Sequence, residues 1–213
     1  MATAKEIRNE KLAATIIRQL RQRHYEACYC RNTTELLDKV ISIIPEGSTI
    51  TWGGSDSIRS SGLTARLKEG NYKVFDRDDA HTDDEKLAIY RKAFECDYYL
   101  ASVNAISEDG VIVNIDGNGN RVGASINGPK KVVYVVGRNK IVDGGIDDAI
   151  ARIKKCACPP NCRRLGKQTP CAATGVCADC DSPDRICKVT VVFDRKPTGI
   201  ACDVVLIDEE LGY

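Results

Sequence analysis

The stretch Ser48-Thr-Ile-Thr-Trp52-Gly-Gly-Ser-Asp56 joins an apolar run to two glycines, a serine and an aspartate. The run predicts a buried strand, and Ser55 with Asp56 predicts the start of a helix that continues to about Glu69. This alternation of strand and helix predicts an α/β fold, a three-layer arrangement with helices on both faces of a sheet. The next segments continue the alternation: a strand over 72–75, a helix over 82–95 and a strand over 97–103.

The pattern changes after residue 103, where turns rich in Gly, Asn and Asp surround a short apolar strand over 111–115. We expect 121–126 to return beside this strand as a hairpin. The segment 131–136 is the most β-prone part of the chain. The remaining expected elements are helices over 4–23, 32–44 and 143–155, and strands over 25–30, 189–193 and 204–207.

The 213 residues carry 31 basic and 30 acidic side chains, a formal net charge of +1, and 43% of them are hydrophobic. This predicts a single globular α/β domain over 1–213, with a cysteine-rich segment over 156–187 inside it. The balanced charge argues against a nucleic-acid partner, which normally selects for a basic excess. The longest apolar run, 132–136, is too short to cross a membrane, and the N-terminus lacks an apolar signal-peptide core. We therefore expect a cytoplasmic protein.

Seven of the eleven cysteines lie between Cys156 and Cys187. Thiols stay reduced in the cytoplasm, so dense cysteine there indicates metal binding or redox chemistry. The pattern Cys171-x5-Cys177-x2-Cys180-x6-Cys187 supplies four thiols, whereas its single Cys-x2-Cys pair matches a zinc ribbon only in part. We predict an iron–sulfur cluster of the 4Fe-4S type on these four cysteines, with zinc as the alternative.

The other seven cysteines have less definite roles. Cys156, Cys158 and Cys162 are not assigned as ligands, although Cys162 could replace one of the four. The remaining cysteines are scattered along the chain, as expected of packing residues: Cys28, Cys30, Cys96 and Cys202. The alternative to a metal site is a loop of free or adventitiously oxidised thiols.

Gly53, Gly54 and Ser55 stand between a predicted strand and a predicted helix. Glycines allow a ligand to approach the backbone closely, and a helix N-terminus attracts negative charge. The three residues therefore predict an anion-binding loop. The alternative is a plain strand-to-helix turn with Ser55 as the N-cap.

A second polar group surrounds the short strand over 111–115. Its pattern fits neither a calcium-binding loop nor the dinucleotide-binding fingerprint. We expect these side chains to form the polar wall of a substrate pocket, whereas ordinary turn chemistry is the alternative. The residues expected in this wall are Glu108, Asp116, Asn118, Asn120 and Arg121.

Three segments together resemble the LUD-domain family of lactate-utilisation proteins: Ile50-Thr-Trp-Gly-Gly-Ser55, 106–121 and 128–137. The cysteine-rich tail over 167–187 is similar to a stand-alone, cysteine-bearing branch of that family found in anaerobes. The resemblance spans nearly the whole chain.

The resemblance implies a fold similar to ribose-5-phosphate isomerase and glucosamine-6-phosphate deaminase. In such folds a glycine loop holds a phosphate or carboxylate, which would place Gly53, Gly54 and Ser55 at the ligand and the second polar group on the facing loops. The family is associated with the oxidation of lactate to pyruvate alongside iron–sulfur and redox subunits.

The leading functional hypothesis is an iron–sulfur redox component, part of an oxidoreductase system, in lactate or organic-acid metabolism. An alternative is a non-redox enzyme on a phosphosugar or acyl-CoA, with a structural zinc loop and a carboxylate such as Glu108 as general base. A third is a regulatory module whose cysteines sense metal or redox state. Expected partners are a small anionic metabolite (carboxylate or phosphate), a redox protein and a second copy of the chain in a homodimer, with neither nucleic acid nor membrane.

Overall fold

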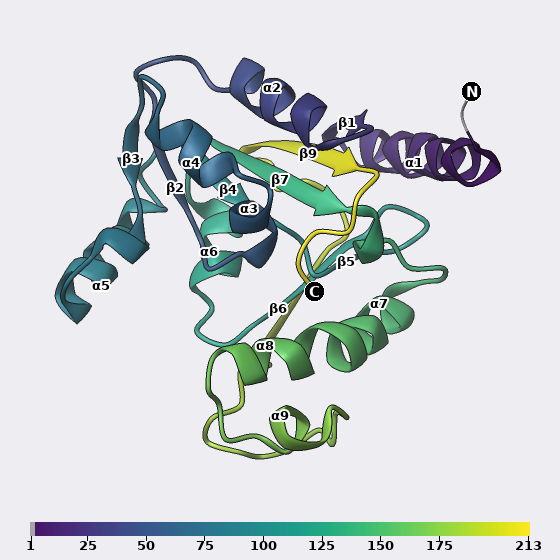
Figure 1. Cartoon of the computed structure of the whole chain (residues 1–213), viewed down its shortest axis with the longest axis vertical. Coiled ribbons are helices and arrows are strands. Elements are labelled where there is room, and N and C mark those ends of the chain that lie inside the picture. Colours follow the sequence, from purple (N-terminus) through teal and green to yellow (C-terminus); the bar gives the residue numbers. More distant parts are fainter. Residues whose placement is uncertain (1–2) are drawn as a thin grey trace.

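The computed structural model describes residues 3–213 and contains a six-stranded sheet flanked by helices (Figure 1). All neighbouring strands of this sheet pair in parallel. The α/β fold expected from the sequence is therefore confirmed. In spatial order the strands are β1 (Glu26–Cys30), β9 (Ala201–Ile207), β7 (Lys131–Gly137), β4 (Tyr98–Ala101), β2 (Thr49–Trp52) and β3 (Lys73–Phe75).

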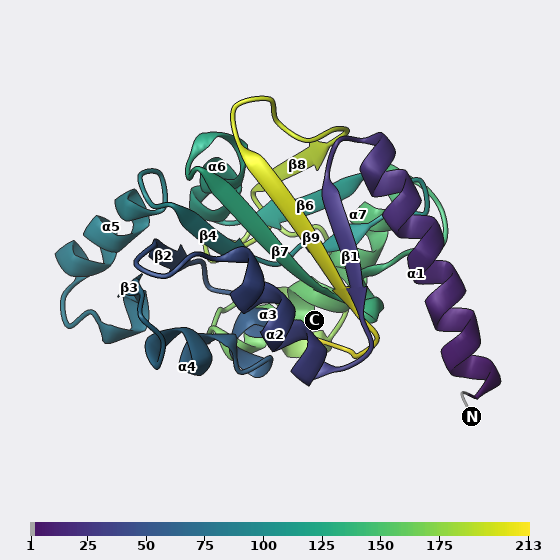
Figure 2. The ribbon, with the colours of Figure 1, turned by 90° about the horizontal axis from the view of Figure 1, so that it is seen from above.

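Helices cover both faces of the sheet, as Figure 2 shows from above. One face packs against α1 and α6, and the other against α2, α3 and α4. Helix α5 contributes no buried residue. The helix bounds are α1 (Ala4–Gln22), α2 (Thr33–Ile43), α3 (Asp56–Ser60), α4 (Leu63–Lys68), α5 (Asp83–Lys92), α6 (Asn120–Asn127), α7 (Ile146–Arg152), α8 (Cys158–Arg164) and α9 (Pro170–Thr174).

Strand β7 lies between β4 and β9 near the middle of the sheet and separates two hydrophobic cores. Val132 and Tyr134 face the core under α1, whereas Val133 and Val135 face the core under α2. All four side chains are buried. Because a parallel sheet is covered on both faces, its central strand is a continuous apolar run, which explains the strong β signal of this segment.

A second, antiparallel sheet is formed by β5 (Ala105–Ile106), β6 (Ile112–Asp116) and β8 (Val189–Phe193). Helix α7, a π-helical turn over Ile153–Ala157 and α8 run on continuously. Buried side chains of β6, α7 and the π-helical turn pack together in a third core that includes Cys158. This core attaches the cysteine-rich segment below the main sheet (Figure 1).

The expected return strand over 121–126 is wrong, because these residues lie in α6. The Asp116 carboxylate accepts hydrogen bonds from the backbone N–H groups of Arg121 (3.0 Å) and Val122 (3.3 Å), and so satisfies free donors of the helix start. Strand β6 pairs instead with β8, a segment far along the chain.

The single helix expected over 56–69 is divided into α3 and α4 at Gly62, whose φ is 78°. Within residues 3–213, no helix is both long and apolar enough to span a membrane.

The Asp97 side chain joins the beginnings of β2 and β4. It accepts hydrogen bonds from the Thr49 backbone N–H (2.8 Å) and hydroxyl (2.7 Å), and lies 2.6 Å from the Lys130 ammonium group. Lys130, then Thr49, hold the pKa of this carboxyl well below its ordinary value of 3.8. Stability from the ionised carboxylate is therefore present above pH 3.8 and is lost as the pH falls below it.

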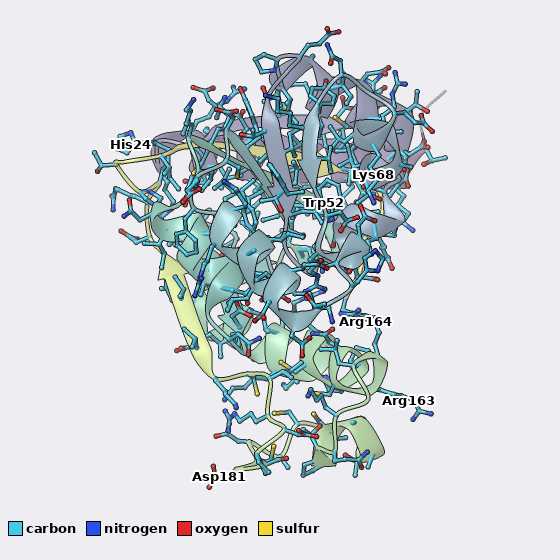
Figure 3. All side chains as sticks on the ribbon, turned by 90° about the vertical axis from the view of Figure 1, so that its left-hand side faces the viewer. His24, Trp52, Lys68, Arg163, Arg164 and Asp181 are labelled. Atoms are coloured by element: carbon cyan, nitrogen blue, oxygen red, sulfur yellow. The ribbon has the colours of Figure 1, made fainter. Side chains whose placement is uncertain are left out.

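Replacing Asp97 with Asn removes this charge-assisted acceptor and should lower the free energy of unfolding by about 1–2 kcal/mol at pH 7. Urea unfolding measures the loss, and the difference from wild type should shrink as the pH falls below that ordinary value. Asp181, which is exposed at the tip of the cysteine-rich segment (Figure 3), gives the matched control D181N. Equal losses in the two variants would contradict the assigned role of Asp97.

Candidate functional site

A cavity of about 370 Å³ opens outside the carboxyl ends of the main-sheet strands. Gly54 follows β2, Ser102 follows β4 and Lys140 follows β7, and all three line it. The opposite side is formed by the π-helical turn, α8 and part of the cysteine-rich segment. Ligands of open α/β sheets commonly bind at this edge, where successive loops converge.

Two arginines lie directly against the Gly53-Gly54 pair. A Cβ atom added to Gly53 would lie 2.8 Å from Cγ of Arg121, and one added to Gly54 would lie 2.5 Å from Nη2 of Arg77. Side chains at either position would collide with these arginines. Gly54 thus makes room for Arg77, and Gly53 makes room for both Arg121 and the Tyr99 hydroxyl, which would lie 2.5 Å from the added Cβ.

Arg77 comes from the segment after β3 and stands beside Gly54. Its Nη1 donates to the Tyr90 hydroxyl (3.0 Å), and its guanidinium lies 5.9 Å from the centre of the Tyr90 ring. Its Nε is buried, lies 3.5 Å from the Asp78 carboxylate and makes no hydrogen bond within the described part of the chain. The Arg77 side chain as a whole lines the cavity and is 21% exposed, so a ligand can reach its guanidinium group at atoms other than the buried Nε.

Asp116 organises the facing loop. Its carboxylate accepts from the backbone N–H of Gly117 (2.8 Å) as well as from the start of α6, and lies 3.6 Å from Nε of Arg121. The Nη2 of Arg121 donates to the Ile115 carbonyl (2.9 Å). These contacts fix the guanidinium of Arg121 at the cavity wall, so Asp116 acts mainly as a holder of the loop.

The structure brings most of the residues expected in the anion site to one cavity. Gly54, Ser55, Asp116, Asn118, Asn120 and Arg121 all line it. Gly53 lies behind Arg121 and does not line the cavity. Glu108 is exposed in the turn before β6, where its backbone N–H donates to the Gly144 carbonyl (3.1 Å), and it lies outside the cavity lining. The structure therefore does not place Glu108 in the pocket wall, where the sequence predicted it.

Lys140 is a buried cation of the cavity that the sequence did not reveal. The residue is 3% exposed, and its ammonium group donates to the Tyr213 carbonyl oxygen. Arg152 also donates to this oxygen, at 3.1 Å. Burial, and then the charge of Arg152, lower the pKa of the Lys140 amine to about 7. A modest gain in negative charge nearby would restore its full protonation.

The wall opposite the glycine pair belongs to α8 and the residues that follow it. Asn161, Arg164 and Lys167 contribute polar groups, and Cys158 lines the cavity beside them. Counting both walls, the lining carries five cationic side chains and two carboxylates, Asp56 and Asp116. Basic side chains therefore outnumber carboxylates in the lining, although the whole chain is nearly neutral. Arg77 and Lys140 belong to no sequence motif, and the sequence predicts no place in the pocket for Arg164 and Lys167, which lie among the cysteines.

The thiols are grouped differently from the predicted ligand set. Burial, followed by the neighbouring thiols of Cys187, Cys162 and Cys177, raises the pKa of the Cys158 thiol to about 12. Burial also raises the pKa of the Cys162 thiol to about 11; Thr169 opposes this shift, while Cys171 and Cys187 add to it. Cys158 and Cys162, which the sequence left unassigned, thus belong to the same group as Cys171 and Cys187.

Cys177 and Cys180 are half-buried at the outer part of the segment. Asp179 between them has a φ of 45° and forms ion pairs with Lys154 (3.1 Å) and Arg185 (2.9 Å). Within residues 3–213, no three cysteine, histidine or carboxylate side chains are arranged to hold one metal ion. The predicted metal site on Cys171, Cys177, Cys180 and Cys187 stays a prediction.

A parallel sheet with a polar cavity at the carboxyl ends of its strands is an architecture of α/β ligand-binding proteins. The family model described as the LUD domain matches residues 13–207, and the chain belongs to this family. A DUF162 family protein from Deinococcus radiodurans has a similar fold, with a TM-score of 0.54 at 11% sequence identity over 93% of this chain and 98% of that one. No curated protein matches the chain.

Replacing Gly54 with Ala should displace the Arg77 guanidinium and weaken anion binding at least fivefold without unfolding the domain. Titration with malonate or inorganic phosphate measures the effect through the fluorescence of Trp52, the single tryptophan of the chain, which adjoins the loop. G145A is the control, because a Cβ at Gly145 meets open space. Unchanged affinity in G54A would remove the glycine–arginine contact from the binding site.

Proposed function

We propose that this protein binds a small organic anion in the cavity, as part of lactate or related organic-acid metabolism. The observation that carries the proposal is the excess of cationic side chains over carboxylates in a cavity at the carboxyl edge of the sheet. Arginine guanidinium groups match carboxylates and phosphates with paired hydrogen bonds, and both Arg77 and Arg121 line the cavity. Membership of the LUD domain family supports the metabolic setting.

We further propose that the cysteine-rich segment binds an iron–sulfur cluster, so that the protein acts as a redox component. Thiolates that lie close together repel one another, and metal ions relieve this repulsion by binding the deprotonated form. Thiolate donors suit iron or zinc. The thiols of the described residues are not arranged as a preformed metal site, so the cysteine-rich segment would have to close around the metal on binding. Cys158 and Cys162 are candidate ligands in addition to the four predicted from spacing. A cluster there would supply electron transfer beside the cavity.

The alternative is a non-redox enzyme with a structural zinc loop. Its expected general base, Glu108, lies outside the cavity lining, so this part of the alternative loses its support. Metal content separates the two proposals directly: an iron–sulfur cluster gives iron, sulfide and a coloured protein, whereas a zinc site gives zinc and a colourless protein.

Protein purified without oxygen should contain iron and acid-labile sulfide, and should absorb at ~400 nm through thiolate-to-iron charge transfer. Replacing Cys171 with Ser should abolish the absorption or reduce it severely. C202S is the control, because Cys202 is also buried but lies in the main core. Colourless protein with one equivalent of zinc would favour the structural alternative, and loss of absorption in both variants would point to unfolding.

Anion affinity should fall as the pH rises through 7. The Lys140 amine has a pKa of about 7, so it is protonated and attracts anions below this value and is neutral above it. Titrations with malonate at pH 6 and pH 8 should differ several-fold in wild type, and the difference should largely disappear in K140M. If the affinity of K140M for malonate still depended on pH in the same way, a group other than Lys140 would be responsible.

A further inference from the structure

We propose that the ligand of this cavity carries two anionic groups at its two ends, one held by each wall, as in a phosphorylated hydroxy acid. The inference rests on the proposed anion site and names the class of ligand that the site takes. Lactate carries a single carboxylate, and such a ligand can engage only one of the two walls.

The first anionic position lies against the main sheet. Gly54 and Gly53 leave room there for Arg77, which lies in the turn after β3, and for Arg121, which lies in the first turn of α6. The Arg77 side chain is partly exposed (21%) and lines the cavity, as Arg121 does. A carboxylate or phosphate at this position would accept from an arginine that the fold has already oriented.

The second anionic position lies on the cysteine-rich side. Cys158, Asn161 and Arg164 are spaced three residues apart along α8, which places them on one face of the helix, and all three line the cavity. The Nη2 of Arg164 donates only to the Asn161 side chain (2.7 Å). Within residues 3–213, no carboxylate forms an ion pair with Arg164, and the nearest one to Lys167 is Asp184 at 3.8 Å. Among the described residues, Arg164 is therefore the cation of this wall without an ion pair, and it is the one that we assign to the ligand.

Size and charge favour a ligand that reaches both positions. The cavity volume of about 370 Å³ falls within the range of sites for metabolites larger than lactate. Its lining carries five cations against two carboxylates, and Asp116 is already committed to α6 and Arg121. A ligand with one charge would leave the positive charge of one wall uncompensated in a confined space, whereas a ligand with a charge at each end compensates both.

Adjacent arginines provide a matched test of the second position. Arg163 and Arg164 are both exposed neighbours at the end of α8, but only Arg164 lines the cavity. Figure 3 shows Arg163 extending outward from the segment and Arg164 lying where the segment meets the body of the protein. Replacement of either by Gln removes the same charge from the same helix end.

The experiment measures dissociation constants of lactate, inorganic phosphate, succinate and 3-phosphoglycerate at one pH and ionic strength, by calorimetry on the full chain. We expect 3-phosphoglycerate to bind at least tenfold more tightly than lactate or phosphate. The affinity for succinate shows whether two carboxylates can occupy the two positions in place of a carboxylate and a phosphate. R164Q should weaken the binding of 3-phosphoglycerate about tenfold and the binding of lactate much less. R77Q should weaken both ligands, and R163Q should match wild type.

Thermal melting of each variant checks that it is folded. Equal affinities for lactate and 3-phosphoglycerate, or equal effects of R163Q and R164Q, would overturn the two-position ligand while the anion site itself stands. Failure of all four anions to bind wild type would overturn the anion site, and the two-position ligand with it.

Discussion

The close contact between a glycine pair and two arginines is the constraint on which the candidate site depends. Strand β2 ends at Trp52, and the next two residues have no side chains, so Arg121 and Arg77 can lie against the backbone there. Asp116 positions Arg121 by accepting from the start of α6, and Tyr90 positions Arg77 through its hydroxyl. The carboxyl edge of the parallel sheet forms one wall of the cavity, and the segments beyond the strand ends carry its basic side chains. A larger residue at either glycine would move a cation out of the cavity wall.

Much of the main sheet could be predicted from the sequence, because its strands are continuous apolar runs between clear helix starts such as Asn32 and Thr82, which are both observed N-caps. The return strand over 121–126 was wrong for a physical reason. Its apolar residues are few, and the carboxylate of Asp116, five residues earlier than Arg121, starts a helix that no local pattern reveals. The partner of β6 is β8, and such a distant pairing cannot be read from local periodicity.

The candidate site was predictable only in part. Gly54, Ser55 and the polar turn around Asn118 stood out by composition and do line the cavity. Arg77, Lys140 and Arg164 did not, because the fold brings these basic residues together from three distant segments. Spacing alone did not include Cys158 and Cys162, which α8 places near Cys171, Cys177 and Cys187. Cys158 on α8 therefore belongs both to the cavity lining and to the group of thiols.

The most direct test of the central claim is a crystal structure of the protein with malonate or 3-phosphoglycerate. The account predicts density for an anionic group between the guanidinium groups of Arg77 and Arg121, beside Gly54. With the longer ligand, density should continue towards Arg164. An anion bound elsewhere on the molecule, with Arg77 and Arg121 unchanged and the cavity filled only by water, would contradict the account.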